Sequence, residues 1–179
     1  NCYQKKKMKI LYFINHRPFF VSHRLPIAIK MKNDGCKIYL LTGKSADKKM
    51  ENFAIRKIKE RKIHSKLLDF NSSSLNIFKL IKTFYDSYNY IKKLNPDLIH
   101  SASMKANIIS GLCCVLMRKP TVIAFSGFGY IFTDNNKIKM KLIGTLVKLL
   151  LKIIFLNKKK HIIVQNKFDL NFLIQNFIL

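Results

Sequence analysis

The stretch SGFGYIFT, residues 126–133, lies between a short apolar run and a long helical pattern. The run before it, Thr121–Phe125, is apolar and β-branched like a buried strand, and the helical pattern begins near Asn135. Two glycines one residue apart let the backbone turn tightly and approach a ligand closely. In a parallel α/β sheet, such a turn lies at the carboxyl edge of the strands, where ligands bind. The same glycines also suit a turn that binds nothing, because a GxG motif alone is a weak signal.

On both sides of this stretch, short apolar runs alternate with longer helical patterns. Six runs predict strands, at Lys9–Ile14, Lys37–Leu41, Lys62–Leu68, Asp97–His100, Thr121–Phe125 and His161–Gln165. Six patterns predict helices, at Val21–Asn33, Asp47–Lys59, Leu75–Leu94, Lys105–Met117, Asn136–Leu156 and Phe168–Phe177. This alternation predicts an α/β fold with a doubly wound, mostly parallel, Rossmann-like sheet. Because its connections are right-handed, we expect the loops after the strands to gather along one edge.

The composition fits one well-buried domain with a strong positive charge. The chain has 179 residues, 49% of them hydrophobic, and its net charge of +25 comes from 34 basic against 9 acidic residues. Such an excess favours nucleic acid, phosphorylated ligands or an anionic membrane surface. Most of the basic residues are lysines spread along the chain, so charge alone selects none of these partners.

Several classes of protein are excluded by missing patterns. The first predicted strand is followed by a loop without glycine, which argues against an NAD site, and no P-loop, G-x-S-x-G or D-x-D motif occurs. Four cysteines without a C-x-x-C pair predict buried free thiols, and we expect no metal and no cofactor. No run of eighteen apolar residues predicts a spanning helix. Residues 1–7 are expected to be a disordered or extraneous extension before one domain at 8–179.

The first loop and the helix after it hold two His-Arg pairs. Asn15, His16 and Arg17 are expected in the loop, because Pro18 predicts that the helix begins after them. His23 and Arg24 then fall in the first helical turns. A guanidinium near helix-terminal amides suits a phosphate or a sugar hydroxyl. The alternative is a His23 packed in the core and a solvated Arg24.

The loop after the fourth predicted strand is rich in hydroxyl groups. Ser103 and Lys105 lie where a helix begins, an arrangement that suits a diphosphate. A capped helix with an exposed lysine is the alternative.

A stripe of lysines follows the glycine stretch. Lys137, Lys141, Lys148 and Lys152 fall within roughly 80° on a helical wheel, beside a wide apolar surface. Such a helix can lie in an anionic membrane interface. The alternative is a helix that covers the sheet and turns its lysines to solvent.

Three passages in this order carry a family resemblance: KILYFINHRPFFVSHRLPIA at Lys9–Ala28, HSASMKANIISGL at His100–Leu112, and Thr121–Thr133 with the later VQNKFD at Val164–Asp169. The chain resembles the amino-terminal domain of family-4 glycosyltransferases, which are retaining enzymes of GT-B fold. It looks most like the branch that extends polyprenyl-diphosphate-linked sugars, which includes N-acetylgalactosaminyltransferases.

The resemblance implies a cleft between two Rossmann-like domains, in which this domain receives the lipid-linked acceptor. Asn15, His16 and Arg17 would line the acceptor pocket, with His23, Arg24, Ser103 and Lys105 also on the acceptor side. The glycine loop would lie near the transferred sugar or the donor phosphate, through Ser126, Gly127, Phe128, Gly129 and Tyr130. Many family members carry a histidine where this chain has Ser126, so no role of that histidine is assigned here.

A second departure concerns length. Members of this family are about twice as long, and their carboxy-terminal half holds an E-x7-E pattern around the donor diphosphate. This chain has only Glu51 and Glu60, nine apart, in a helix that looks surface-exposed. The donor domain is therefore expected to be absent, so that the chain alone transfers sugar poorly.

The resulting hypothesis is the acceptor-binding half of a glycosyltransferase that moves a sugar from a nucleotide sugar, taken to be a UDP-sugar, to a lipid-linked saccharide in bacterial glycan, capsule or O-antigen assembly. Its partners would be the polyprenyl-diphosphate-linked saccharide, an anionic membrane surface and the missing donor domain. We expect it in the cytoplasm, peripheral on the inner face of the plasma membrane. One alternative is a non-catalytic, membrane-recruiting subunit of a split glycosyltransferase. A basic nucleic-acid-binding domain is less favoured, because no nucleic-acid recognition motif occurs.

Overall fold

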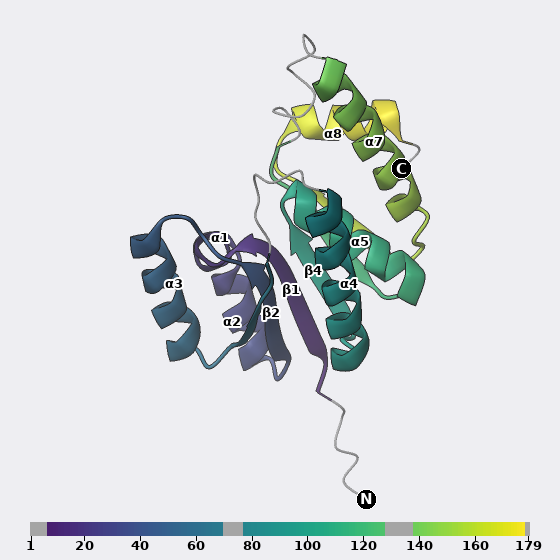
Figure 1. Cartoon of the computed structure of the whole chain (residues 1–179). Helices are drawn as coiled ribbons and strands as arrows, with labels where there is room; N and C mark the ends of the chain where they lie inside the picture. Colours follow the sequence, from purple (N-terminus) through teal and green to yellow (C-terminus); the bar gives the residue numbers. More distant parts are fainter. Residues whose placement is uncertain (1–6, 70–76, 128–137, 178–179) are drawn as a thin grey trace, which may run out of the picture.

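The computed structural model describes residues 7–69, 77–127 and 138–177 as a six-stranded sheet with helices on both faces (Figure 1). The strands are β1 Lys9–His16, β2 Lys37–Gly43, β3 His64–Leu67, β4 Leu98–Ala102, β5 Thr121–Phe125 and β6 Lys160–Val164. The helices are α1 Arg17–His23, α2 Leu25–Asn33, α3 Lys48–Glu60, α4 Ile77–Leu94, α5 Met104–Met117, α7 Ile138–Phe155 and α8 Lys167–Asn176.

All neighbouring strands of the sheet are parallel, in the order β3-β2-β1-β4-β5-β6. The predicted doubly wound, Rossmann-like fold is confirmed. The chain builds outward from β1 to β3 and then returns to add β4 on the other side of β1. Such a reversal opens a crevice beyond the carboxyl ends of the two central strands, where ligands bind in open α/β sheets.

Alternate side chains of the central strands supply the two sides of the core. Tyr12 and Ile14 of β1 belong to the cluster that also holds Phe20 of α1 and Ala28 of α2. Residues one position away, such as Leu11, face the other side, where α4 and α5 pack. A third cluster joins β5 to α7 and α8. Successive side chains of a buried strand point to opposite faces of the sheet, and this alternation decides against which helices each residue packs.

The helix predicted at Val21–Asn33 is two helices that meet at Arg24, and this corrects the sequence prediction. Pro26 lies in the first turn of α2, where its missing N–H is not needed, whereas inside one continuous helix its ring would clash with the preceding turn. Arg24 has φ −125° and does not continue the helical backbone.

The first connection is also shorter than expected. β1 runs to His16, and α1 begins directly at Arg17, so Asn15, His16 and Arg17 do not form a separate loop. Pro18 does not delay the helix, because proline is well accommodated in a first turn. His23 ends α1 instead of lying in its first turns.

Other boundaries moved by a few residues. β4 extends to Ala102, and α5 begins at Met104. The expected starts of two helices, at Leu75 and Asn136, lie outside the described residues. Cys36, Cys113 and Cys114 are free; the prediction of buried thiols is confirmed for the last two, whereas Cys36 is only partly buried.

Candidate functional site

The carboxyl ends of three neighbouring strands bring most of the predicted site residues to one edge. Ile14 of β1 pairs with Ala102 of β4, and Ala102 pairs with Ala124 of β5. Parallel neighbours lie about 4.8 Å apart, so the residues that follow these three positions are close together. These residues include Asn15, His16, Ser103 and Ser126. The sequence prediction that the unusual loops gather at one edge is confirmed for these strands.

His16 caps the first helix. Its Nδ1 accepts a hydrogen bond from the backbone N–H of Phe19 at 3.2 Å, and its own backbone is extended. Burial lowers the pKa of His16, and the nearby Glu51 carboxylate opposes this effect. Because Nδ1 accepts, the neutral ring carries its proton on Nε2. His16 therefore offers an N–H donor rather than a positive charge.

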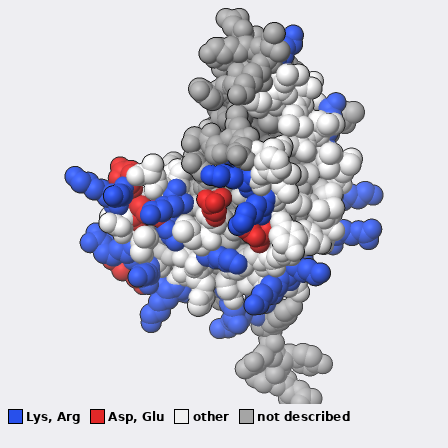
Figure 2. Space-filling model, in the orientation of Figure 1, with Lys and Arg blue, Asp and Glu red and all other residues white. Residues whose placement is uncertain are grey.

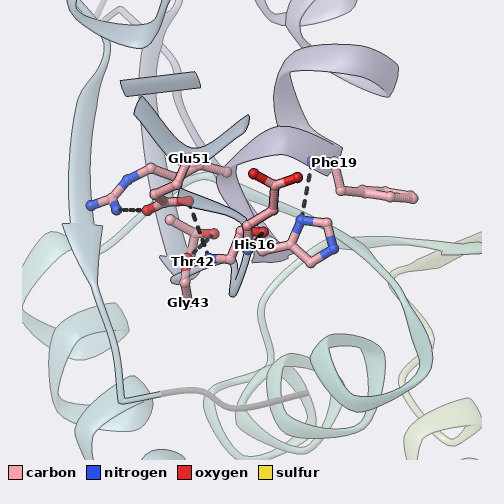
Figure 3. Close-up of polar contacts among 8 residues, drawn as sticks. His16, Phe19, Thr42, Gly43 and Glu51 are labelled. Carbon is pink, nitrogen blue, oxygen red and sulfur yellow. Dashed lines mark hydrogen bonds and ion pairs between the residues drawn. The ribbon is translucent and has the colours of Figure 1, made fainter. Parts of the chain in front are cut away.

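Arg17 is tied to Glu51, which reaches it from α3 (Figure 3). The Glu51 side chain is only 2% exposed, and its second oxygen accepts from the backbone N–H of Ser45 at 3.1 Å. Figure 3 shows Glu51 beside His16 and the end of β2 at Thr42–Gly43. The expectation that Glu51 lies on a surface was wrong. Its carboxylate instead joins the β1–α1 junction to the β2–α3 junction.

Sequence reasoning missed Glu51 because charge was given more weight than periodicity. α3 is rich in exposed charged residues, and Glu60 at its end is indeed half-exposed. However, Glu51 lies three residues before Ala54 and seven before Ile58, and all three are buried. That spacing marks one helical face, so the signal was present in the sequence.

A second group of polar residues lies under α1. Arg24 is 8% exposed and donates from Nη1 to the carbonyl of His23 at 3.1 Å. His100 of β4 is also 8% exposed, and its ring stacks on Tyr12 with centroids 5.1 Å apart. Burial, together with the smaller effect of the Arg24 charge, lowers the pKa of His100 to about 4. The alternative of a solvated Arg24 was wrong.

His23 itself lies on the outside of α1. It is exposed, and its ring stacks on Phe19 at 4.4 Å while Nδ1 contacts the Ser22 hydroxyl at 2.6 Å. The alternative of a His23 packed in the core was therefore wrong as well.

The start of α5 differs from an ordinary capped helix. Ser103 has φ +83°, which is rare for a residue with a side chain, and its buried hydroxyl has no hydrogen-bond partner among the described residues. Lys105 is partly buried, and burial lowers its pKa. Asn107 donates to the carbonyl of Ala124 at 2.9 Å and so fixes α5 against β5. The alternative of a capped helix with an exposed lysine was therefore wrong, because the Ser103 side chain does not cap the helix and Lys105 is partly buried.

The glycine stretch is described only at its beginning. Ser126 is exposed, and Gly127 has φ +132°; apart from its chain neighbours, no atom of the described residues lies within 4 Å of the position where a Cβ would stand. This backbone conformation requires glycine, because a side chain would be strained there. Phe128, Gly129 and Tyr130, together with Lys137, lie outside the described residues.

The remaining lysines of the predicted stripe divide into two kinds. Lys141 and Lys152 are exposed on α7. Lys148 turns toward α8, where it donates to Asn176 Oδ1 at 2.8 Å and lies 5.4 Å above the Phe172 ring. Five apolar side chains on α7 and just after it are exposed beside these lysines: Leu142, Leu146, Leu149, Ile153 and Leu156. Within the described ranges, no helix is long and apolar enough to cross a bilayer.

For metal binding, the described residues hold no group of three or more His, Cys, Asp or Glu side chains close enough to bind an ion. The edge offers hydrogen-bond donors and cations. His16, Arg24, Lys105 and the Gly127 backbone all suit oxygen-rich anionic or sugar ligands.

The sequence profile of the glycosyl transferase 4-like family matches residues 9–166. The chain belongs to that family. The match covers β1 to β6 and therefore every edge residue described above. No curated protein matches the sequence.

Solved structures share the fold of this glycosyl transferase 4-like chain at low identity. They include MurG of Acinetobacter baumannii (19% identity, 78% of this chain and 39% of that one, TM-score 0.52). A glycosyltransferase of Rickettsia africae is 15% identical to this chain. The similarity covers 90% of this chain and 44% of that one, with a TM-score of 0.54. Sucrose-phosphate synthase of Thermosynechococcus elongatus is 11% identical to this chain. The similarity covers 94% of this chain and 45% of that one, with a TM-score of 0.58. The sheet thus matches one half of GT-B structures.

These similarities define the fold and not the reaction. The chain spans less than half the length of the glycosyltransferases it resembles. The same fold also occurs in a UDP-GlcNAc 2-epimerase of Neisseria meningitidis, at 9% identity with a TM-score of 0.54. The family match therefore carries the functional argument, and the solved structures carry the architecture.

Proposed function

We propose that this chain is the acceptor-binding half of a retaining glycosyltransferase that moves a sugar from a nucleotide sugar to a lipid-linked saccharide. The acceptor would carry a polyprenyl diphosphate, and the pathway would be bacterial glycan, capsule or O-antigen assembly. The observation that carries the proposal is the convergence of hydrogen-bond donors and cations at the carboxyl ends of β1, β4 and β5. Family membership supplies the reaction class.

Each edge residue would have a distinct part in holding the acceptor. The Nε2–H of His16 would donate to a sugar hydroxyl, since its Nδ1 is already used by Phe19. Lys105 at the start of α5 would face a phosphate oxygen, where helix amides also attract negative charge. The open backbone at Gly127 would allow the transferred sugar to come close. Arg17 would act mainly by fixing this edge through Glu51.

The donor and its leaving diphosphate would belong to a second domain. Stabilising a departing diphosphate needs preorganised cations and amides on that side. A second candidate is a split enzyme, in which another polypeptide would supply this domain. Adding a separately produced donor domain would restore transfer in that case.

An anionic membrane would present the acceptor to this half. The exposed leucines of α7 lie beside Lys141 and Lys152, and further apolar side chains, Phe78, Ile81 and Tyr85, are exposed on α4. Figure 2 shows basic side chains around the lower and left parts of this face, while the upper right, along α7, is largely uncharged. An apolar strip with flanking lysines suits the headgroup region of anionic lipids.

The test is direct binding of a short-chain polyprenyl diphosphate that carries an N-acetylhexosamine. We expect Lys105→Gln to weaken binding about tenfold, because one charged hydrogen bond to phosphate is lost. Lys49→Gln, on the exposed surface of α3, is the matched control and should bind like the unaltered chain. Equal affinity of both variants would remove Lys105 from the acceptor site. No binding by any of the proteins would refute the acceptor-half proposal.

A further inference from the structure

The junction of α1 and α2 encloses a positive charge that has no counter-charge among the residues the structure describes. Arg24 is more than nine-tenths buried, and its Nε has no hydrogen-bond partner among the described residues. Within the described ranges, the one hydrogen bond of this side chain goes from Nη1 to the carbonyl of the preceding residue. The nearest compensation is the Phe19 ring, 6.0 Å from Cζ. A buried guanidinium whose Nε lacks a partner is costly unless an anion joins it.

A second unused polar group lies close to this guanidinium. The Nε2 of His100 is buried without a hydrogen-bond partner within the described part of the chain. The groups that face His100 come from two elements, the stacked Tyr12 of β1 and Arg24 from the α1–α2 junction. Neither carries a negative charge at neutral pH, because burial raises the pKa of Tyr12 to about 12. Among the described residues, this cluster therefore has a positive charge and no negative one.

We propose that Arg24 and His100 form an internal anion site that takes a phosphate group of a phosphate ester or diphosphate. The guanidinium fork matches two phosphate oxygens, and the imidazole supplies a further donor once it is protonated. Each residue keeps 8% of its surface accessible, whereas Arg24 Nε and His100 Nε2 themselves are buried. The site itself follows from burial and unused donors; only the lipid-linked diphosphate as its source rests on the proposed function.

Binding at this site is coupled to protonation of His100. In the free protein the ring is neutral at pH 7, since its pKa lies near 4. A dianion beside the ring favours the imidazolium form, so the pKa of His100 rises when the anion binds. By linkage, the affinity for the anion increases as the pH falls from 7 toward 5.

The decisive probe is sulfate, which keeps two negative charges over this pH range. The imidazole proton signals of His100 are followed by NMR against pH, with and without saturating sulfate. We expect sulfate to raise the pKa of His100 by about one unit or more, as a close opposite charge does. An identical titration in both buffers would overturn the proposal without any variant being needed.

Substitutions separate the two roles. Arg24→Gln should weaken sulfate binding about tenfold or more, while Arg56→Gln, an exposed arginine on α3, should leave it unchanged. His100→Gln should still bind sulfate, but without the increase in affinity at low pH. The control His161→Gln removes an exposed ring on β6 and should keep that increase. Unaltered sulfate binding by Arg24→Gln would overturn the assignment.

Competition then identifies the source of the phosphate. A short-chain polyprenyl diphosphate should displace sulfate at lower concentration than uridine diphosphate if the acceptor supplies it. Tighter binding of uridine diphosphate would keep the anion site and overturn the acceptor-half proposal. Failure of both compounds and of pyrophosphate to displace sulfate would overturn the phosphate site.

Discussion

Glu51 shows how one buried carboxylate organises the edge of the sheet. It binds Arg17 from the start of α1 and the backbone of Ser45 before α3. Two strand-to-helix junctions, which follow β1 and β2, are therefore held by the same side chain. A ligand at this edge would therefore contact two junctions that are held together, instead of two independent turns.

Removing the Glu51 charge tests this link. Glu51→Gln should lower the free energy of unfolding by about 3 kcal/mol, because it leaves Arg17 in a largely buried place without its carboxylate. Arg17 is 13% exposed, which keeps the loss at the lower end of the range for buried pairs. Denaturant unfolding at pH 7 measures the change.

The matched control is Glu60→Gln in the same helix. Its ion pair with Lys57 is half-exposed, so the expected change is below about 1 kcal/mol. Equal losses for both variants would mean that the Arg17–Glu51 pair does no more than a surface pair.

His100 predicts a pH dependence of stability. An unfolded histidine binds a proton below about pH 6.5, whereas folded His100 does so only near pH 4. The unfolded state thus holds more protons between these values, and stability falls as the pH drops from 6.5 to 4, by up to about 3 kcal/mol. The measurement is denaturant unfolding from pH 7.5 to 4.5.

His100→Gln should flatten that curve, because glutamine does not titrate. A smaller slope should remain, since the pKa of His16 is lowered as well. A variant that followed the wild-type curve throughout would show that His100 is not the group responsible.

At the scale of whole elements, the contact between α5 and α7 depends on one glycine. A Cβ added to Gly111 of α5 would stand 2.7 Å from Cγ2 of Ile154 in α7. The two helices therefore approach as closely as they do only because position 111 has no side chain. This contact sets where α7 lies over β5.

Gly111→Ala should destabilise the protein despite favouring the helix. Overpacking costs about 1–3 kcal/mol, and the gain in helix propensity of about 1 kcal/mol offsets only part of it. Ile154→Ala alone should cost about 2–5 kcal/mol through the cavity it leaves. The double variant should lose less than the sum of the two, because the alanine methyl enters that cavity. Strict additivity in unfolding experiments would argue against the contact.

The bounds of a strand or helix could be predicted from the sequence where a local residue pattern decides them, and less well where it does not. The buried run at Thr121–Phe125 was recognised with its final boundaries, because a fully buried strand is continuously apolar. The break at Arg24 was missed, since the apolar spacing continues through it and only Pro26 marks it. The third strand was placed too long, because β3 is an exposed edge strand with little apolar signal.

For the molecule as a whole, we predict that α7 mediates binding to anionic vesicles. Lys141→Glu with Lys152→Glu should reduce co-sedimentation with vesicles containing acidic lipid by about tenfold or more, since each basic residue near such a surface contributes about 1 kcal/mol. Lys49→Glu with Lys59→Glu on α3 changes the net charge equally and is the matched control.

Two results would contradict this prediction. Equal loss in both double variants would mean that net charge, not the α7 surface, drives binding. Salt-sensitive binding to duplex or single-stranded nucleic acid, with none to vesicles, would favour the nucleic-acid alternative instead.

Apart from the break at Arg24, the sequence by itself determined the order and type of the elements, because periodicity and turn residues act within a few positions of the chain. It also placed His16, Ser103 and Gly127 at one edge, since parallel strands with right-handed connections leave no other arrangement. Only the tertiary structure decided that Arg17 meets Glu51, that Lys148 turns to α8, and that Arg24 lies buried beside His100. Those contacts join residues far apart in the chain, and the burial that gives them their chemistry exists only once the helices have packed on the sheet.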